Sequence, residues 1–215
     1  MDDYSSALQS HQRALAIRIK LFREEHESTA DSYRQLGVTQ YNMHDYRAAL
    51  QSEQHVLAIR IKLFGEEHES TADSYRDLGV TQYNIHDYSS ALQSHQRALA
   101  IRIKLFGDEH DSTADSYRQL GVTQYNMHDY STALQSHQRA LGIRIKLFGE
   151  EHESTANSYS ELGVTQHKIR DYSAALQSHQ HALAIRIKLF GEEHESTADS
   201  YRQLGATQYL SLIHI

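Results

Sequence analysis

Histidine is the residue type in this sequence with the most evident capacity for chemistry, with 16 copies among 215 residues. The histidines fall into three series with a period of 42 residues, represented by His26, His44 and His95. A zinc site built on helices typically uses two histidines four residues apart, or cysteine, and neither is present. The closest pair, His179 and His181, would point in different directions on a helix. The periodicity therefore favours structural or surface histidines, and we expect no metal.

Other catalytic patterns are equally missing from the sequence. Cysteine is absent, which leaves no thiol nucleophile, no thiolate metal site and no disulfide. The glycines occupy helix-packing or helix-stop positions and form no phosphate-binding loop. Serine, histidine and aspartate are plentiful, but no segment resembles a nucleophile elbow. We therefore expect neither catalysis nor a cofactor.

The formal charge of −7 is spread over interspersed acidic and basic residues. A protein that binds nucleic acid usually gathers positive charge on one surface, so nucleic acid is not expected as a partner. No stretch approaches 18 apolar residues, and the first residues carry no secretory signal, so no membrane association is expected either. Together with the absence of cysteine, these features favour a cytoplasmic location.

A 42-residue unit organises the whole chain. The Asp-Tyr pair that opens it recurs at Asp3-Tyr4, Asp45-Tyr46, Asp87-Tyr88, Asp129-Tyr130 and Asp171-Tyr172. Each unit contains two amphipathic helical patterns, two short turns and no strand signal. The sequence therefore predicts an all-α solenoid of antiparallel helix pairs, a class whose usual function is binding.

The period also sets the expected boundaries. We expect one array over residues 1–209, with a half repeat at 1–26, complete helix pairs at 27–68, 69–110, 111–152 and 153–194, and a half repeat at 195–209. Residues 210–215 form a tail outside the repeat.

Local signals place the two helices of each unit. Ser28-Thr29-Ala30-Asp31 has the form of a capping box, which predicts the start of the first helix there. Behind it, Tyr33, Leu36, Gly37 and Met43 follow helical spacing, and Gly37 would let a neighbouring helix approach closely.

The second helix is predicted to start after Asp45 as N-cap and to stop at Gly65. Its predicted buried stripe consists of Ala49, Leu50, Val56, Leu57, Ile59, Ile61 and either Leu63 or Phe64. Arg23 stands at the stop position in the first copy and would cost roughly 1 kcal/mol in a left-handed conformation. Gly142, inside a helix, would cost about 1 kcal/mol.

The unit resembles the tetratricopeptide repeat through Tyr75, Leu78-Gly79, Asp87-Tyr88, Ala91 and Ala98. The resemblance covers residues 1–209. The longer period and the run AL-x-I-x-x-x-LFG-x-x-H-x-x-TA are similar to the 42-residue variety in kinesin light chains and nephrocystin-3-like proteins. The resemblance implies a right-handed α-solenoid.

The sequence also departs from that subgroup. Glu or Asp follows the histidine where proline is usual, and the subgroup's paired, peptide-contacting asparagines are replaced by Arg34-Gln35, Arg76-Asp77, Arg118-Gln119, Ser160-Glu161 and Arg202-Gln203. Because these asparagines are replaced, the cargo preference of that subgroup is not expected to apply to this chain.

The resemblance implies that the first helices line a concave groove that binds an extended or helical peptide of a protein partner. Tyrosine would offer rigid contact area there, and Gln, Asn, Arg and Asp would bind peptide polar groups. The implied groove residues are Asp31, Arg34, Gln35, Val38, Tyr41, Asn42, Asp73, Arg76, Asp77, Val80, Tyr83, Asn84, Asp115, Arg118, Gln119, Val122, Tyr125, Asn126, Asn157, Ser160, Glu161, Val164, His167 and Lys168.

Three alternatives stay open. Asp31 and Arg34, three residues apart, could simply pair with each other on a solvated face. The array could be the recognition arm of a larger enzyme or nucleotide-driven signalling protein, or it could be a structural spacer.

One copy differs from the others at Asn157, Ser160, Glu161, His167, Lys168 and Arg170. All six positions fall on or beside the expected groove. The differences could form a specificity patch, or they could be drift at exposed positions after recent duplication.

Both ends interrupt the period. Met1 is in register with Met43 and Met127, which lie inside the unit. The tail 210–215, LSLIHI, is what CTGTCTCTTATACACATC encodes, and this string matches a transposase adapter used for sequencing libraries. The hypothesis is an artefact of cloning or read-through, and the alternative is a genuine apolar helix end. If both ends are cut, we expect the isolated chain to self-associate through uncapped apolar faces.

Overall fold

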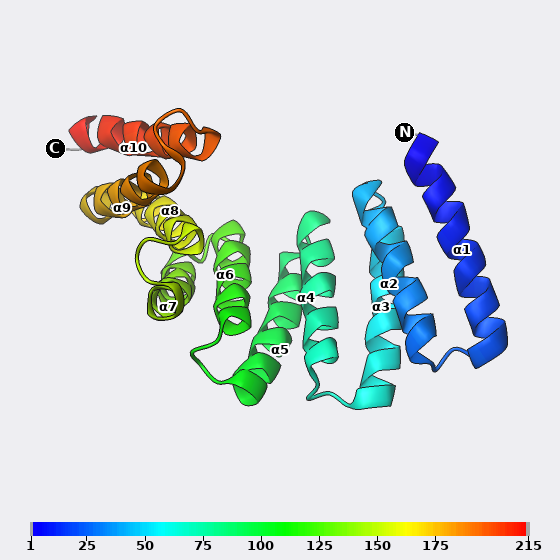
Figure 1. Cartoon of the computed structure of the whole chain (residues 1–215). Coiled ribbons are helices and arrows are strands. Elements are labelled where there is room, and N and C mark those ends of the chain that lie inside the picture. Colours follow the sequence, from blue (N-terminus) through cyan, green and yellow to red (C-terminus); the bar gives the residue numbers. More distant parts are fainter. Residues whose placement is uncertain (1, 214–215) are drawn as a thin grey trace. The chain divides into compact units, whose positions relative to one another are not determined.

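The computed structural model describes residues 2–213, and all the regular structure in that range is helical (Figure 1). The helices are α1 (Asp2–Phe22), α2 (Glu27–Asn42), α3 (Tyr46–Phe64), α4 (Glu69–Asn84), α5 (Tyr88–Phe106), α6 (Asp111–Asn126), α7 (Tyr130–Phe148), α8 (Glu153–Lys168), α9 (Tyr172–Phe190) and α10 (Glu195–Ile213). The all-α solenoid of helix pairs is thereby confirmed. Of the expected tail 210–215, residues 214 and 215 lie outside the described range, and α10 runs to Ile213.

The helices gather into two compact units that meet in sequence between residues 105 and 106. In the first unit, α1 packs on α2, α2 on α3 and α3 on α4. In the second unit, each of α6, α7, α8 and α9 packs on the helix that follows it (Figure 1). Ile17 and Leu21 on α1, and Tyr209 and Leu212 on α10, leave more than half of their surface exposed.

Histidine, not serine, caps the first helices. The predicted capping box at Ser28 is wrong, because α2 already begins at Glu27 and His26 is its N-cap. His26 Nδ1 accepts a hydrogen bond from the Ser28 backbone N–H at 3.1 Å, and its ring stacks on Phe22 with 4.6 Å between centroids. The same cap recurs at His68, His110 and His152. One of the three histidine series therefore starts helices.

The second helices begin and end as predicted. Asp45 caps α3 by accepting a hydrogen bond from the Ala48 N–H at 3.2 Å. Gly65 ends α3 with a φ of 88°, a conformation that glycine adopts without strain. Arg23 takes the equivalent position with a φ of 70°. A second histidine series also lies in left-handed turns, at His44, His86 and His128, with Arg170 in the fourth copy.

The predicted buried stripe is only partly correct. Ala49, Val56 and Ile59 are buried, but Leu63 and Phe64 are 40% and 38% exposed. The reason is length: α3 has 19 residues, whereas α2 and α4 have 16. The last turn of α3 therefore extends past the helices that cover the rest of it.

The third histidine series explains why the first helix of a pair has a glycine at this position. A Cβ atom built on Gly79 would lie 2.5 Å from His95 Cε1, and one built on Gly121 would lie 2.6 Å from His137 Cε1. Both histidine rings are almost fully buried. The paired helices therefore approach so closely at this point that the imidazole occupies the space of a missing side chain, which confirms the predicted role of this glycine.

Beside this contact, a hydrogen bond between a serine and a glutamine joins the two helices of each pair. Ser136 Oγ donates to Gln124 Oε1 at 2.7 Å, joining α7 to α6. The same bond recurs at Ser52–Gln40, Ser94–Gln82 and Ser178–Gln166.

Two glycines of the second unit provide a matched test of this packing. We expect Gly121→Ala to lower the free energy of unfolding by about 2 kcal/mol, because the new methyl group must displace the buried His137 ring. Gly142→Ala meets no atom within 4 Å, so it should stabilise α7 by about 1 kcal/mol through helix propensity. Urea unfolding followed by circular dichroism measures both. Equal effects of the two substitutions would contradict the close approach.

Candidate functional site

The structure brings five of the predicted groove residues together in the first unit. Arg34, Val38 and Tyr41 from α2 face Asp77 and Val80 from α4 across a cavity of about 200 Å³. The remaining lining residues are Glu53 and Val56 from α3 and Ser74 and Thr81 from α4. Asp31, Gln35 and Asn42 are exposed and lie outside this lining. The cavity is thus built between two consecutive first helices, with the second helix between them as its floor.

Glu53 on that floor was missed by the sequence reasoning. Its Oε1 accepts a hydrogen bond from Thr81 Oγ1 at 2.8 Å, while its Oε2 is buried without a hydrogen-bond partner among the described residues. Burial raises the pKa of Glu53 to about 8; the negative charge of Asp77 adds to the shift, and the Thr81 hydrogen bond opposes it. A signal was present, because Glu53 stands where the other copies have histidine.

Tyr41 forms part of the rim and links neighbouring first helices. Its hydroxyl accepts a hydrogen bond at 3.0 Å from Asn84 Nδ2, which also donates to the Val80 carbonyl at 2.7 Å. The Tyr41 ring packs edge-on against Tyr46 with 5.2 Å between centroids. Burial raises the pKa of Tyr41, with Tyr46 adding to the shift. The tyrosine is therefore a fixed, neutral surface near neutral pH.

A corresponding cavity of about 240 Å³ lies in the second unit. Its lining includes the predicted residues Val122, Tyr125, Asn126, Ser160, Glu161 and Val164, together with His137, Thr165 and Gln203. His137 occupies the position that Glu53 has in the first unit. The two cavities share valine and tyrosine walls and differ in the ionisable group on the floor.

His137 and Glu161 do not form an ion pair at neutral pH. Burial lowers the pKa of His137 to about 4, and the positive charge of Arg118 acts in the same direction. Burial also raises the pKa of Glu161, against the opposing effects of Arg118 and Arg144. His137 Nδ1 and Glu161 Oε2 are 3.8 Å apart, which exceeds hydrogen-bond distance. The imidazole is therefore neutral, and Arg118 at 3.4 Å is the counter-charge of Glu161.

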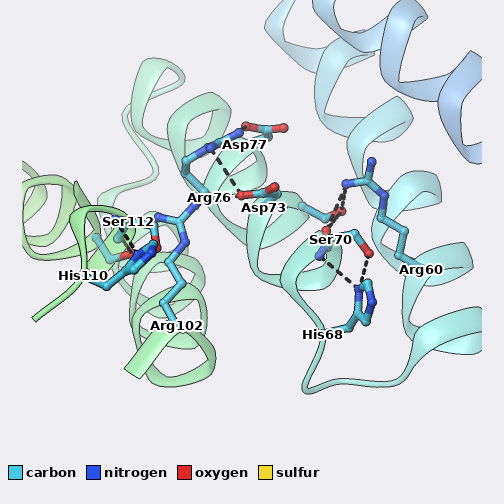
Figure 2. Close-up of polar contacts among 11 residues, drawn as sticks. Arg60, His68, Ser70, Asp73, Arg76, Asp77, Arg102, His110 and Ser112 are labelled. Atoms are coloured by element: carbon cyan, nitrogen blue, oxygen red, sulfur yellow. Dashed lines mark hydrogen bonds and ion pairs between the residues drawn. The ribbon is translucent and has the colours of Figure 1, made fainter. Parts of the chain in front are cut away.

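Arginines of the second helices, of which Arg144 is buried and Arg60 half-buried, connect neighbouring helix pairs. Arg60 Nη1 donates to the Ser70 carbonyl at 2.9 Å and to Ser74 Oγ at 3.0 Å, which fastens α3 to α4 (Figure 2). Arg144 makes the corresponding bond to Ser158 Oγ at 2.8 Å, from α7 to α8. These bonds fix the register of one helix pair on the next within each unit.

Arginines at the equivalent position of three second helices bind three residues that were predicted to contact a ligand. Arg102 Nη2 lies 2.8 Å from Asp73 Oδ1, and Arg144 Nη2 lies 2.6 Å from Asp115 Oδ1. Arg186 Nη2 donates to Asn157 Oδ1 at 2.7 Å. Asp73, Asp115 and Asn157 therefore have structural contacts of their own.

Pairing within the first helix, the alternative raised for Asp31 and Arg34, occurs in later copies. Asp73 and Arg76 are 3.4 Å apart, and Arg76 also lies 2.7 Å from Asp77 (Figure 2). Asp115 and Arg118 are 3.7 Å apart. Part of the predicted polar stripe is thus paired within the protein.

Two of the six residues that distinguish the fourth copy contact α10, while Asn157 contacts Arg186 on α9 and Glu161 contacts Arg118 on α6. Ser160 is only 6% exposed, and its Oγ donates to Gln203 Oε1. His167 Nδ1 lies 3.1 Å from Thr207 Oγ1, and burial lowers the His167 pKa. Lys168 is exposed. Much of the variation in this copy therefore serves a contact between helices.

The chain matches the tetratricopeptide repeat family over residues 1–62, 54–104, 84–146 and 125–188. It belongs to the tetratricopeptide repeat family. No match is found among curated protein sequences.

Solved structures of tetratricopeptide repeat (TPR) arrays share the fold. BtubC (BKLC) from P. vanneervenii is 20% identical, with a TM-score of 0.82 over 97% of this chain and 84% of that protein. A putative kinesin light chain from Podosopora anserina with nearly identical TPR-like repeats is 22% identical, with a TM-score of 0.78 over 87% of this chain and 89% of that one. The apo form of RapI is 16% identical, with a TM-score of 0.79 over 95% of this chain and 54% of that one.

Between residues 2 and 213, none of the helices has the length and apolar character that crossing a membrane requires. In the same range, no cluster of three or more histidine or acidic residues has the arrangement of a metal site.

Exchanging Asn and Asp at equivalent positions tests the arginine contacts. Asn157→Asp should stabilise the fold by about 1 kcal/mol, because Arg186 then gains the charged acceptor that Arg144 already has. Asp115→Asn should destabilise it by a similar amount. Thermal unfolding at low and high salt measures both, and effects of the same sign would contradict the assignment.

The buried Glu53 carboxyl predicts a pH-dependent stability. Its pKa is raised in the folded state, so the folded protein binds more protons than the unfolded chain between about pH 4.5 and 8, and stability falls as the pH rises through this window. Glu53→Gln should therefore raise the free energy of unfolding by roughly 4 kcal/mol at pH 8 and have little effect at pH 4. Urea unfolding at both pH values measures this, with the exposed Glu66→Gln as control. A pH-independent effect of Glu53→Gln would contradict the burial argument.

Proposed function

We propose that the chain is a protein-interaction module that binds a peptide segment of a partner protein along its first helices, without catalysis of its own. The observation that carries this proposal is the pair of cavities between α2 and α4 and between α6 and α8. Each has aliphatic walls, a tyrosine at its rim and a few buried polar groups, which is the usual character of a recognition pocket.

The spacing of these features suits an extended chain better than a compact ligand. The helices α2, α4 and α6 repeat a valine, a tyrosine and an asparagine every 42 residues, whereas α8 has Val164 followed by His167 and Lys168. A peptide laid across α2 and α4 therefore meets this set twice. Asn84 and Tyr41 are held by their mutual hydrogen bond, and a partner therefore meets a preorganised surface with a small entropic cost. A peptide ligand uses both the pockets and the polar groups between them.

Composition indicates the class of partner and the cellular compartment. The interspersed charges and net charge of −7 favour a protein over nucleic acid as partner. A cytoplasmic setting fits a chain without cysteine.

The test begins with a displayed library of random peptides selected on the full chain. Binding of each selected peptide is then titrated by fluorescence anisotropy against the wild type, Val38→Asp and Val122→Asp. Val38 is 47% exposed, so a charge there should disturb the groove without unfolding the helix. A peptide that uses the first cavity should bind at least about tenfold more weakly to Val38→Asp, a loss of about 1.4 kcal/mol.

Two comparisons make the result decisive. Gln51→Asp, at an exposed position on α3, is the matched control and should leave binding unchanged. Tyr41→Ala, Tyr83→Ala and Tyr125→Ala together should abolish binding, while circular dichroism shows the helicity retained. Selection of no peptide, or selection only of peptides that bind all variants equally, would refute groove binding and favour the structural spacer.

A further inference from the structure

The cavity of the first unit contains an acceptor that the protein itself does not satisfy. Glu53 Oε2 is buried and has no hydrogen-bond partner in the described part of the chain. Buried polar atoms in folded proteins are nearly always paired. Burial raises the pKa of Glu53 to about 8, so the carboxyl of the empty cavity is protonated near pH 7. A cationic donor that enters the cavity favours the ionised form, displaces this proton and pairs with the oxygen. Glu53 Oε1, by contrast, already accepts the Thr81 hydroxyl.

The walls around that oxygen are aliphatic. Val38, Val56 and Val80 from three different helices line the cavity with Glu53. Its volume of about 200 Å³ is several times the roughly 30 Å³ that one water molecule occupies in the liquid. A chain of four methylene groups ending in a small donor therefore fits between the valines and the carboxyl.

We infer that this cavity accepts a lysine side chain of the bound peptide, with its methylene stem against the three valines and its ammonium group on Glu53 Oε2. The inference rests on the proposed peptide-binding function and specifies one side chain of the ligand. An ammonium is a compact donor that can use a single oxygen. A guanidinium prefers both oxygens of a carboxylate, and here one of them is occupied by Thr81.

The charges around the cavity favour this occupant over its rivals. Arg34 from α2 and Asp77 from α4 are the other charged lining residues, Tyr41 is the remaining ionisable one, and Asp77 already lies 2.7 Å from Arg76. An acidic side chain could use Arg34 but would meet Glu53 and Asp77. A purely apolar side chain would leave Oε2 buried and unpaired, which is costly.

The second unit provides an internal comparison. Its cavity has equivalent walls in Val122 and Val164, but its floor carries His137 in place of Glu53. The acidic residue there, Glu161, already has Arg118 at 3.4 Å as its counter-charge. Glu161 Oε2 is, like Glu53 Oε2, buried without a hydrogen-bond partner in the described part of the chain. Because Arg118 offsets the charge of Glu161, we expect a lysine to bind the second cavity more weakly than the first.

The experiment uses Nα-acetyl-lysine N-methylamide as the probe, with the norleucine and glutamate analogues as neutral and acidic comparisons. Each is titrated at about pH 9, above the pKa of Glu53, into the full chain with isotope-labelled valine methyl groups and followed by NMR. The lysine probe should produce saturable shifts at Val38, Val56 and Val80 at lower concentrations than at Val122 and Val164. Its affinity should exceed that of the norleucine probe by about tenfold or more, as a charge-assisted hydrogen bond predicts.

Two substitutions at one position provide the controls. Glu53→Gln keeps the shape of the side chain and should remove the preference for lysine over norleucine. Glu53→His reproduces the residue of the other copies and should do the same, while circular dichroism confirms that both variants are folded. Equal affinities of the lysine and norleucine probes for the wild type, tighter binding of the glutamate probe, absence of saturable shifts, or an unchanged preference in Glu53→Gln would each overturn the inference.

The outcome is distinguishable from that of the peptide selection. If selected peptides lose affinity for Val38→Asp but bind Glu53→Gln as they bind the wild type, the groove function stands and the lysine pocket is refuted. If the lysine probe binds through Glu53 but no peptide is selected, the pocket stands and peptide binding along the helices is refuted.

Discussion

The close approach of the two helices in each pair is the constraint on which the other features depend. It is possible because the first helix has a glycine where the second helix presents a large side chain, as with Gly79 and His95. The imidazole fills the gap in three copies. In the pair formed by α2 and α3 the same position holds Glu53, which lies farther from its glycine, with 3.6 Å from Glu53 Cγ to the Cβ position of Gly37. The identity of this one residue thus decides which group forms the floor of each cavity.

The arginines of the second helices fix this geometry from one pair to the next within each unit. Arg60 and Arg144 each bind a serine of the following first helix, and Arg144 also binds Asp115 on the preceding one. A guanidinium out of water is stable only when such partners satisfy it, so these contacts allow little alternative register. Within each unit the valines and tyrosines on the first helices are held at fixed spacing as a result, which is what a preorganised binding surface requires.

Most of the fold was predictable because the repeat shows each local signal several times. Helix pairs, the Asp45 cap, the Gly65 stop and the close packing at Gly37 all follow from local stereochemistry. The His26 cap was missed because serine, threonine and aspartate are the usual capping residues. Glu53 was missed because the groove was assigned to first helices alone, whereas the cavity floor comes from the second helix. The roles of Asp73 and Asp115 depend on arginines 29 residues away, a contact that helical spacing does not reveal.

The central claim is that Glu53 is a desolvated carboxyl at the floor of a recognition cavity. The most direct test is a ¹³C NMR titration of the Glu53 side-chain carboxyl in the full chain. The structure predicts a midpoint of about pH 8, because burial disfavours the carboxylate. A midpoint near the ordinary value of 4.5 would show that water reaches both oxygens, and it would contradict the account of the cavity and its ligand.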